Sequence, residues 1–276
     1  MIDAQTKYVA IFGNPVSHSL SPKMHNAAFN DCGLNMAYLA FRVEEAADAA
    51  RAMRRLGILG ASITVPHKET IMPHLDDLDE VSREIGAVNT VFAQDRGLVG
   101  YNTDWLGAVR ALEQVTSLSG KSCLIFGAGG AARAAVYGLQ RKGVEVLLTN
   151  RSEARGRRLA AEMKCSFVNW QSWGQLQVEL VINATPVGTS ASEEQTLVPR
   201  HWLQAGMVVM DMVYRPRKTR LLRYAEAADC LCVSGLDMLL YQGAAQFQIW
   251  TGINAPVEVM RKTLIESLQD EENQDH

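Results

Sequence analysis

Residues 122–151 read SCLIFGAGGAARAAVYGLQRKGVEVLLTNR. The apolar run Cys123–Phe126 meets a glycine cluster, an alanine-rich segment with helical character follows, and Gly143 separates it from the apolar run Val144–Leu148. This order predicts a strand, a tight turn, a helix and a second strand, which is one βαβ unit of about the length such a unit needs. Strands also alternate with helices elsewhere in the chain, so we expect an α/β protein.

The glycine cluster fits the fingerprint of a dinucleotide-binding turn. Gly127, Gly129 and Ala132 match the pattern G-x-G-x-x-G/A. The glycines let the backbone turn sharply and approach a pyrophosphate, and the helix N-terminus behind them offers free N–H groups. A glycine-rich turn without a ligand is the alternative, but a strand before the turn and a helix after it favour the dinucleotide site.

The residues after the second strand favour NADP over NAD. NAD sites usually place a carboxylate at this strand tip, where it accepts from the ribose 2′-hydroxyl. The chain instead has Asn150, Arg151, Ser152, Glu153 and Arg155, with Glu153 in the following turn. Arginine suits a 2′-phosphate through charge-assisted bonds and stacking. Arg157 and Arg158 are better explained as a solvated helix face.

Length and composition exclude several classes of protein. A chain of 276 residues can bury a large core and is expected to form two domains. A net charge of −3 gives no reason to expect nucleic acid or an acidic membrane surface as a partner. The five cysteines are scattered and no C-x-x-C is present, so we expect neither disulfides nor a metal site. We also expect no signal peptide and no transmembrane span, and therefore a cytoplasmic protein.

The hydrophobic pattern predicts the remaining elements. Strands are expected at Tyr8–Phe12, Met36–Val43, Gly60–Val65, Ala87–Ala93, Leu98–Tyr101, Leu180–Asn183 and Met207–Met212, and weakly at Cys165–Val168 and Leu231–Val233. Helices are expected after the N-cap Ser21, and over Glu44–Leu56, Leu75–Ile85, Trp105–Val115, Leu236–Trp250 and Val257–Leu268.

Polar side chains follow the strands of the first domain, where ligands bind in open α/β sheets. They are Ser19, Ser21, Thr64, Lys68, Asn89 and Asp104. Each has a structural explanation when taken alone: Ser21 and Asp104 could be helix caps, and Asn89 could be a turn residue. Together they predict a small, hydroxyl-rich pocket with one cation and one carboxylate.

Lys68 and Asp104 are the pair that could carry out chemistry. Hydride transfer between a carbinol and NADP requires a proton to leave the hydroxyl or return to the ketone oxygen. A lysine in an enclosed site can act as that acid or base, and a neighbouring carboxylate would hold it in place. His67 and His18 are alternative proton carriers that the residues alone leave open.

Several motifs occur in one order along nearly the whole chain. They are Gly13-Asn14-Pro15, His18-Ser19-Leu20-Ser21-Pro22, His25-Asn26, Thr64-Val65-Pro66-His67-Lys68, Gly86-Ala87-Val88-Asn89-Thr90, Gly100-Tyr101-Asn102-Thr103-Asp104, Gly127-Ala128-Gly129-Gly130-Ala131, Asn150-Arg151-Ser152, Asn183-Ala184-Thr185-Pro186, Asp211-Met212-Val213-Tyr214 and Gly235-Leu236-Asp237-Met238-Leu239 through Gln242. In these residues the chain resembles the shikimate dehydrogenase family, and so many motifs in one order make the resemblance specific.

The resemblance implies two α/β domains separated by a cleft. Residues 1–104 would form a substrate-binding domain that the C-terminal helices of residues 240–276 join, and residues 105–239 a Rossmann-type NADP-binding domain. It also implies reversible, NADPH-dependent reduction of 3-dehydroshikimate to shikimate, within aromatic amino-acid biosynthesis. A monomer and a homodimer both remain open.

The same resemblance implies roles for individual residues. Those that would hold the substrate are Ser19, Ser21, Thr64, Lys68, Asn89, Asp104, Tyr214 and Gln242, with Lys68 as the acid–base and Asp104 as its partner. Those that would line the cofactor are Glu80, Gly127, Ala128, Gly129, Gly130, Ala131, Asn150, Arg151, Ser152, Arg155, Met212 and Gly235.

Two residues depart from the family pattern. Ser62 stands where the family usually has Asn, and a serine offers one polar group where an asparagine offers two, so the loop carrying Lys68 could shift. Ser152 stands where Thr is common and keeps the hydroxyl. Two other functions remain as alternatives: a relative that prefers quinate or aminoshikimate and has relaxed cofactor use, and a ligand sensor without catalysis. Both serines of the first loop and Arg151 argue against the former, and the presence of Lys68 and Asp104 argues against the latter.

Overall fold

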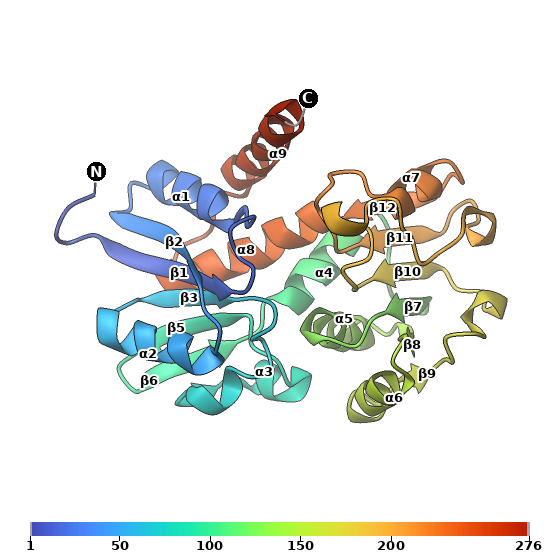
Figure 1. Ribbon diagram of the computed structural model, residues 1–276, viewed down its shortest axis with the longest axis horizontal. Helices are drawn as coiled ribbons and strands as arrows, with labels where there is room; N and C mark the ends of the chain where they lie inside the picture. Colours follow the sequence, from blue (N-terminus) through green and yellow to red (C-terminus); the bar gives the residue numbers. More distant parts are fainter. Residues whose placement is uncertain (1, 275–276) are drawn as a thin grey trace. The chain divides into compact units, whose positions relative to one another are not determined.

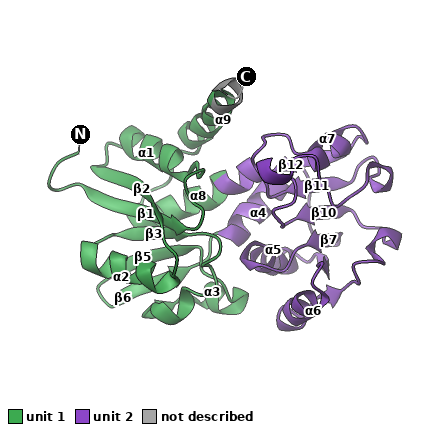
Figure 2. Cartoon of the chain, in the orientation of Figure 1, with its two compact units in different colours: residues 1–103, 240–276 green, residues 104–239 purple. Residues whose placement is uncertain are grey.

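The computed structural model describes residues 2–274, and the chain divides into two compact units. Unit 1 comprises Met1–Thr103 and Leu240–His276, and unit 2 comprises Asp104–Leu239 (Figure 2). Asp104 is thus the first residue of unit 2, whereas the expected first domain of residues 1–104 ends with it. No helix among residues 2–274 is long and apolar enough to cross a lipid bilayer.

Unit 1 is an α/β structure around one mixed sheet (Figure 1). Its elements are β1 (Lys7–Gly13), α1 (Ser21–Asp31), β2 (Met36–Arg42), α2 (Ala46–Leu56), β3 (Gly60–Ile63), the 3₁₀ turn η1 (Met72–His74), β4 (Asp77–Leu78), α3 (Glu80–Ile85), β5 (Thr90–Gln94), β6 (Gly97–Tyr101), most of α8 (Gly235–Thr251) and α9 (Val257–Gln274). The strand order is β2-β1-β3-β5-β6-β4. Strands β1, β2 and β3 are parallel, whereas β5 runs antiparallel to both β3 and β6.

The pleat of the sheet separates two kinds of packing. Phe12 and Ile63 are paired in the β1–β3 register and face α2, where Met53 belongs to the same buried cluster. Successive side chains point to opposite faces, so Ser62 faces the other way, toward α8. On that face Trp250 donates from Nε1 to the backbone carbonyl of Val91 at 3.1 Å. Helix α8 is therefore fixed across the sheet of unit 1 by both packing and hydrogen bonding.

The predicted helix Leu75–Ile85 is wrong in its first half. Only Glu80–Ile85 is helical, because Asp77–Leu78 pairs in parallel with β6 as the short strand β4. Asp79 then starts the helix, since its carboxylate accepts from the backbone N–H of Ser82 at 2.8 Å. An acidic side chain at this position satisfies one of the free N–H groups at a helix start.

The predicted N-cap of the first helix is also wrong. Ser21 is the first residue of α1, Leu20 occupies the cap position, and no side chain caps this end. Pro22 lies in the first turn, where its missing N–H costs nothing. The Ser21 hydroxyl is therefore not committed to capping, and the backbone N–H of Ser21 donates to Ser19 Oγ at 3.3 Å.

Unit 2 is a doubly wound parallel sheet. Its elements are α4 (Asp104–Glu113), β7 (Ser122–Phe126), α5 (Gly130–Arg141), β8 (Glu145–Thr149), α6 (Glu153–Glu162), β9 (Ser166–Phe167), η2 (Trp173–Gln175), β10 (Leu180–Asn183), η3 (Ser190–Ser192), η4 (Arg200–Trp202), β11 (Val208–Asp211), α7 (Arg220–Glu226), β12 (Leu231–Ser234) and the first residues of α8. The strand order β12-β11-β10-β7-β8-β9 reverses between β7 and β10. That reversal is the switch point at which such sheets bind dinucleotides.

The parallel strands of unit 2 are continuous apolar runs because helices cover the sheet. On one side, Phe126 and Val209 belong to a buried cluster with Leu221 and Leu222 of α7. Helix α5 contacts β7 and β8 and packs against α4. Figure 1 shows α5 (green) beside β7 and α7 (orange) beside β12.

Candidate functional site

Several segments of unit 1 end at one edge of its sheet. The parallel strands β1 and β3 both finish there, and β5 starts there because it runs antiparallel to β3. Backbone hydrogen bonds join the segments beyond the strands: Thr64 N donates to Phe12 O at 3.0 Å, and Asn89 N donates to Tyr101 O at 3.1 Å. Residues that are far apart in sequence are thereby gathered at this edge, which we call the polar edge of unit 1.

Asn89 is the centre of the polar edge. The predicted strand Ala87–Ala93 begins only at Thr90, so Asn89 lies just before β5 and is buried. Its Nδ2 donates to Thr103 Oγ1 at 2.9 Å and to Gln242 Oε1 at 3.2 Å. Its Oδ1 accepts from the backbone N–H of Thr103 at 2.7 Å and from Thr90 Oγ1 at 2.8 Å. Two predicted site residues, Asn89 and Gln242, are thus brought into direct contact and held in one orientation.

The other predicted substrate residues of unit 1 lie on segments tied to this edge. Lys68 is half-buried, and its backbone carbonyl accepts from the N–H of Val88 at 2.8 Å, next to Asn89. Thr64 and Ser19 are half-buried, and Ser21 is buried. Asp104 and Tyr214 belong to unit 2. Asp104 is buried at the start of α4 and follows Thr103 directly in the chain.

His67, one of the alternative proton carriers, is committed elsewhere. It is buried, and its Nε2 lies 3.0 Å from the backbone carbonyl of Val43. A carbonyl only accepts, so Nε2 carries the proton and donates it. This hydrogen bond gives His67 the role of fixing the loop after β3 and favours the neighbouring Lys68 as the proton carrier.

Gln246 is a residue of this site that no sequence motif singles out. Its Nε2 donates to Thr90 Oγ1 at 2.9 Å and to the backbone carbonyl of Asn89 at 3.1 Å. Its Oε1 accepts from Ser62 Oγ at 2.9 Å, and Ser62 accepts from the hydroxyl of Tyr38 at 2.7 Å. The buried serine is therefore fully hydrogen-bonded. The available signal was the spacing of Gln242 and Gln246, which places two amides on one face of an apolar helix.

The aromatic wall behind Ser62 includes a fully buried histidine. His25 stacks on Tyr38 with ring centroids 4.7 Å apart and an interplanar angle of 1°. Burial lowers the pKa of His25 to about 3, so the ring is neutral at any physiological pH. A neutral ring suits packing against Tyr38 and gives this histidine no role in proton transfer near pH 7.

The glycine turn of unit 2 has the shape that a pyrophosphate requires. Gly127 has φ +122°, and a Cβ there would lie 2.8 Å from the carbonyl oxygen of Ala184, so only glycine fits. Gly129 is the N-cap of α5, and a Cβ there would meet no atom within 4 Å. The first glycine is thus required by the fold, whereas the second keeps space open in front of a helix N-terminus. An anionic group fits that space.

The other predicted cofactor residues of unit 2 gather at the same sheet edge, because the strands before them are parallel. Gly130 and Ala131 open α5, Asn150 and Ser152 follow β8, Met212 follows β11, and Gly235 follows β12. A Cβ at Gly235 would lie 2.4 Å from the carbonyl oxygen of Met212, so these two segments cross closely. Glu80, by contrast, is exposed at the start of α3 in unit 1.

The arginines after β8 divide into two groups. Arg157 pairs with Glu153 at 2.7 Å, and Arg158 lies 3.8 Å from Glu162. Arg151 and Arg155 are exposed and form no ion pair with the residues that the structure describes. Glu153, the carboxylate that follows this strand tip in the sequence, is paired with Arg157. The two unpaired guanidinium groups therefore fit a phosphate ligand.

Arg151 also lines a cavity of about 1010 Å³ in unit 2, together with Val187, Glu194, Arg200 and Arg220. None of the predicted substrate residues lines this cavity. Among the side chains that the structure describes, residues 2–270, no group of three or more His, Cys, Asp or Glu is placed to hold a metal ion.

Unit 2 is a doubly wound sheet with an open glycine turn, and unit 1 is a second α/β structure with a hydrogen-bonded polar edge. These features define a two-domain dinucleotide-binding protein. Family models agree in three places: residues 11–91 match the shikimate dehydrogenase substrate binding domain, residues 110–216 match shikimate/quinate 5-dehydrogenase, and residues 235–265 match the shikimate 5′-dehydrogenase C-terminal domain. The chain belongs to the shikimate dehydrogenase family.

Individual relatives are similar over almost their whole length. The shikimate dehydrogenase (NADP(+)) of Pyrococcus furiosus is 43% identical over 98% of this chain and 99% of its own. A solved shikimate dehydrogenase in complex with NADP⁺ is 39% identical over 97% of this chain and 98% of its own, with a TM-score of 0.92. The enzyme of Thermus thermophilus, solved with NADP(H) and shikimate, is 35% identical over 95% of this chain and 100% of its own, with a TM-score of 0.88.

Proposed function

We propose that this protein is an NADP-dependent shikimate dehydrogenase, which reversibly reduces 3-dehydroshikimate to shikimate. The observation that carries the proposal is the fixed contact between Asn89 and Gln242 at the polar edge, beside the segment that bears Lys68. A polyol acid needs several oriented hydrogen-bonding groups and one cation, and this edge supplies both. The relatives named shikimate dehydrogenase (NADP(+)) support the same activity.

Two residues would handle the proton. When bound, NADPH supplies the hydride that reduces the ketone carbon. Lys68 would give a proton to the ketone oxygen during reduction and accept one from the hydroxyl during oxidation. Asp104 would be its carboxylate partner, buried directly after Thr103. The remaining substrate residues, Ser19, Ser21, Thr64, Asn89, Tyr214 and Gln242, would bind the carboxylate and hydroxyls of the substrate.

The cofactor residues follow from the sheet edge of unit 2. The backbone from Gly127 to Ala131, at the start of α5, would hold the pyrophosphate. Arg151 and Arg155, with Asn150 and Ser152, would hold the 2′-phosphate. Met212 and Gly235 would lie at the nicotinamide end, and Glu80 would be a further contact from unit 1.

Two glycine variants test the pyrophosphate assignment. Gly129→Ala should leave the melting temperature nearly unchanged, because its backbone is unstrained and its methyl group meets open space. It should nevertheless raise the Kd for NADP⁺ by about tenfold, because the methyl group occupies the approach of the phosphates. Gly127→Ala should instead lower the melting temperature. Equal behaviour of the two variants would contradict the assignment.

Initial rates test the function as a whole. Shikimate oxidation should be fastest with NADP⁺, and much slower with NAD⁺ or with quinate in place of shikimate. Comparable quinate or NAD⁺ rates would indicate the quinate-type alternative, and binding without turnover would indicate a sensor.

We propose the cytoplasm as the compartment of this protein because all five cysteines are free thiols. A monomer or a homodimer can work in this way, because one chain carries every proposed residue.

A further inference from the structure

Asp211 is a buried carboxylate for which the proposed reaction has no use. It is the last residue of β11 and has 0% exposure. Its Oδ1 accepts from Asn183 Nδ2 at 2.9 Å and from the backbone N–H of Val213 at 3.1 Å. Its Oδ2 accepts from Thr219 Oγ1 at 2.7 Å. All three partners are neutral donors, and burial raises the pKa of Asp211 to about 6. A charge buried without a cation is costly, which calls for an explanation.

The three partners of Asp211 belong to three different segments at the sheet edge. Asn183 ends β10, and its Nδ2 also donates to the carbonyl of Val187 at 2.9 Å, so it shapes the loop that follows. Val213 lies between Met212 and Tyr214, two residues of the proposed site. Thr219 caps α7 by accepting from the backbone N–H of Leu222 at 3.3 Å. One carboxylate therefore joins the loop after β10, the loop after β11 and the start of α7.

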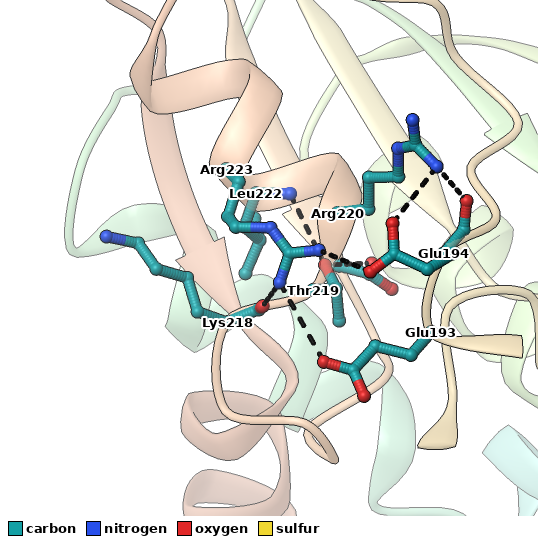
Figure 3. Close-up of polar contacts among 8 residues, drawn as sticks. Glu193, Glu194, Lys218, Thr219, Arg220, Leu222 and Arg223 are labelled. Carbon is teal, nitrogen blue, oxygen red and sulfur yellow. Dashed lines mark hydrogen bonds and ion pairs between the residues drawn. The ribbon is translucent and has the colours of Figure 1, made fainter. Parts of the chain in front are cut away.

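The loop after β10 bears directly on the glycine turn. A Cβ on Gly127 would lie 2.8 Å from the carbonyl oxygen of Ala184, the residue after Asn183. A small shift of this loop therefore changes the space in front of the turn. The same loop is also held from outside, since Arg220 donates to Glu194, and Arg223 lies 3.9 Å from Glu193 and 3.8 Å from Glu194 (Figure 3). These outer pairs are largely exposed, and such pairs contribute little.

The position of Asp211 decides which part of the cofactor it affects. In doubly wound sheets the residue that contacts the adenosine ribose follows the second strand, which is β8 here. The half of the sheet beyond the switch point, β10 to β12, is left for the nicotinamide half of the cofactor. All three partners of Asp211 lie in that second half.

We propose that Asp211 is a positioning residue that sets the loops after β10 and β11 for the nicotinamide half of NADP. This rests on the proposed function. The carboxylate acts through Asn183, Val213 and Thr219 and does not itself touch the cofactor. An amide is a poor replacement, because its N–H₂ group would meet Thr219 Oγ1, whose hydroxyl would have to turn from donor to acceptor. The two hydrogen bonds from Asn183 and Val213 would also lose their charged acceptor.

Binding of NADP⁺ and of 2′,5′-ADP to Asp211→Asn tests the proposal, because 2′,5′-ADP lacks the nicotinamide half. The Kd for NADP⁺ should rise about tenfold, as expected for lost hydrogen bonds to a charged group. The Kd for 2′,5′-ADP should rise clearly less, by no more than about threefold, because this ligand reaches the loop after β10 only through its phosphate at the glycine turn. A general structural defect would weaken both ligands alike, and that result would overturn the proposal, as would unchanged binding of both.

Matched variants complete the test. Thr219→Val removes the hydroxyl that donates to Asp211 and should show the same selective loss, whereas Thr219→Ser should bind like the wild type. Glu179→Gln is the control for losing a carboxylate, since Glu179 accepts from Ser122 N and Oγ at the opposite edge of the sheet. Arg223→Ala tests the outer pairs, and a loss as large as that of Asp211→Asn would assign the positioning to them instead. A wild type that binds no NADP⁺ would overturn the proposed function and this inference together.

Discussion

Replacing Lys68 with alanine should lower the turnover of shikimate oxidation by about 10²–10⁴-fold, the range that general acid–base catalysis contributes. The KM for shikimate should change by less than about threefold, because the fixed amides of Asn89 and Gln242 remain to bind the hydroxyls. Proton transfer is needed in both directions, so reduction of 3-dehydroshikimate should slow by a similar factor. Steady-state rates in both directions measure this effect.

Three companion variants make the Lys68 test specific. Lys68→Arg keeps a positive charge but cannot release a proton, so its turnover should stay low while the substrate still binds. Lys262→Ala removes an exposed lysine that lies 3.8 Å from Glu266 and should have no effect. His67→Ala should mainly lower stability, because it removes a buried hydrogen bond to Val43. Wild-type turnover by Lys68→Ala, with a loss in His67→Ala, would assign the proton to the histidine.

The parts of the fold that the sequence predicts well are those with strong local signals. Strands β7 and β8 follow from their apolar runs, and the turn at Gly127 follows from a glycine pattern with one physical meaning. The segment Leu75–Asp79 is different. Its hydrophobic pattern suits a helix, but its conformation depends on pairing with a strand outside the segment. Asp77–Leu78 pairs with β6, a strand that comes later in the chain, and a sequence window does not contain its partner.

The same distinction applies to the candidate site. Lys68, Asn89 and Gln242 belong to motifs and could be named from the sequence. Thr103 and Gln246 could not be given roles, because their significance lies in hydrogen bonds to Asn89 and Thr90 that only the folded chain creates. Ser62 shows the converse. Its departure from the family pattern suggests a missing polar group, yet Tyr38 and Gln246 satisfy the serine fully.

Replacing Arg151 with alanine should lower kcat/KM for NADP⁺ by about 10- to 100-fold, mainly through a higher KM, since a hydrogen bond to a charged group is worth about 1.5–3 kcal/mol. The kcat/KM for NAD⁺ should fall by no more than about threefold, because NAD⁺ has no 2′-phosphate and would lose only the stacking of Arg151 on the adenine. The preference for NADP⁺ over NAD⁺ should therefore shrink by at least several-fold. Parallel rate measurements with both cofactors give this ratio directly.

The contrast between neighbouring arginines makes this prediction sharp. Arg158 lies in α6, the helix that follows Arg151, but its guanidinium is 3.8 Å from Glu162, so Arg158→Ala should leave the cofactor preference unchanged. Arg155→Ala should act in the same direction as Arg151→Ala, since Arg155 also lacks an ion pair among the described residues. Because both side chains are exposed, added salt should weaken NADP⁺ binding in the wild type more than in Arg151→Ala. If Arg151→Ala reduced NADP⁺ and NAD⁺ rates equally, the arginine would serve the adenine alone, and the choice of cofactor would have to come from another residue at this strand end.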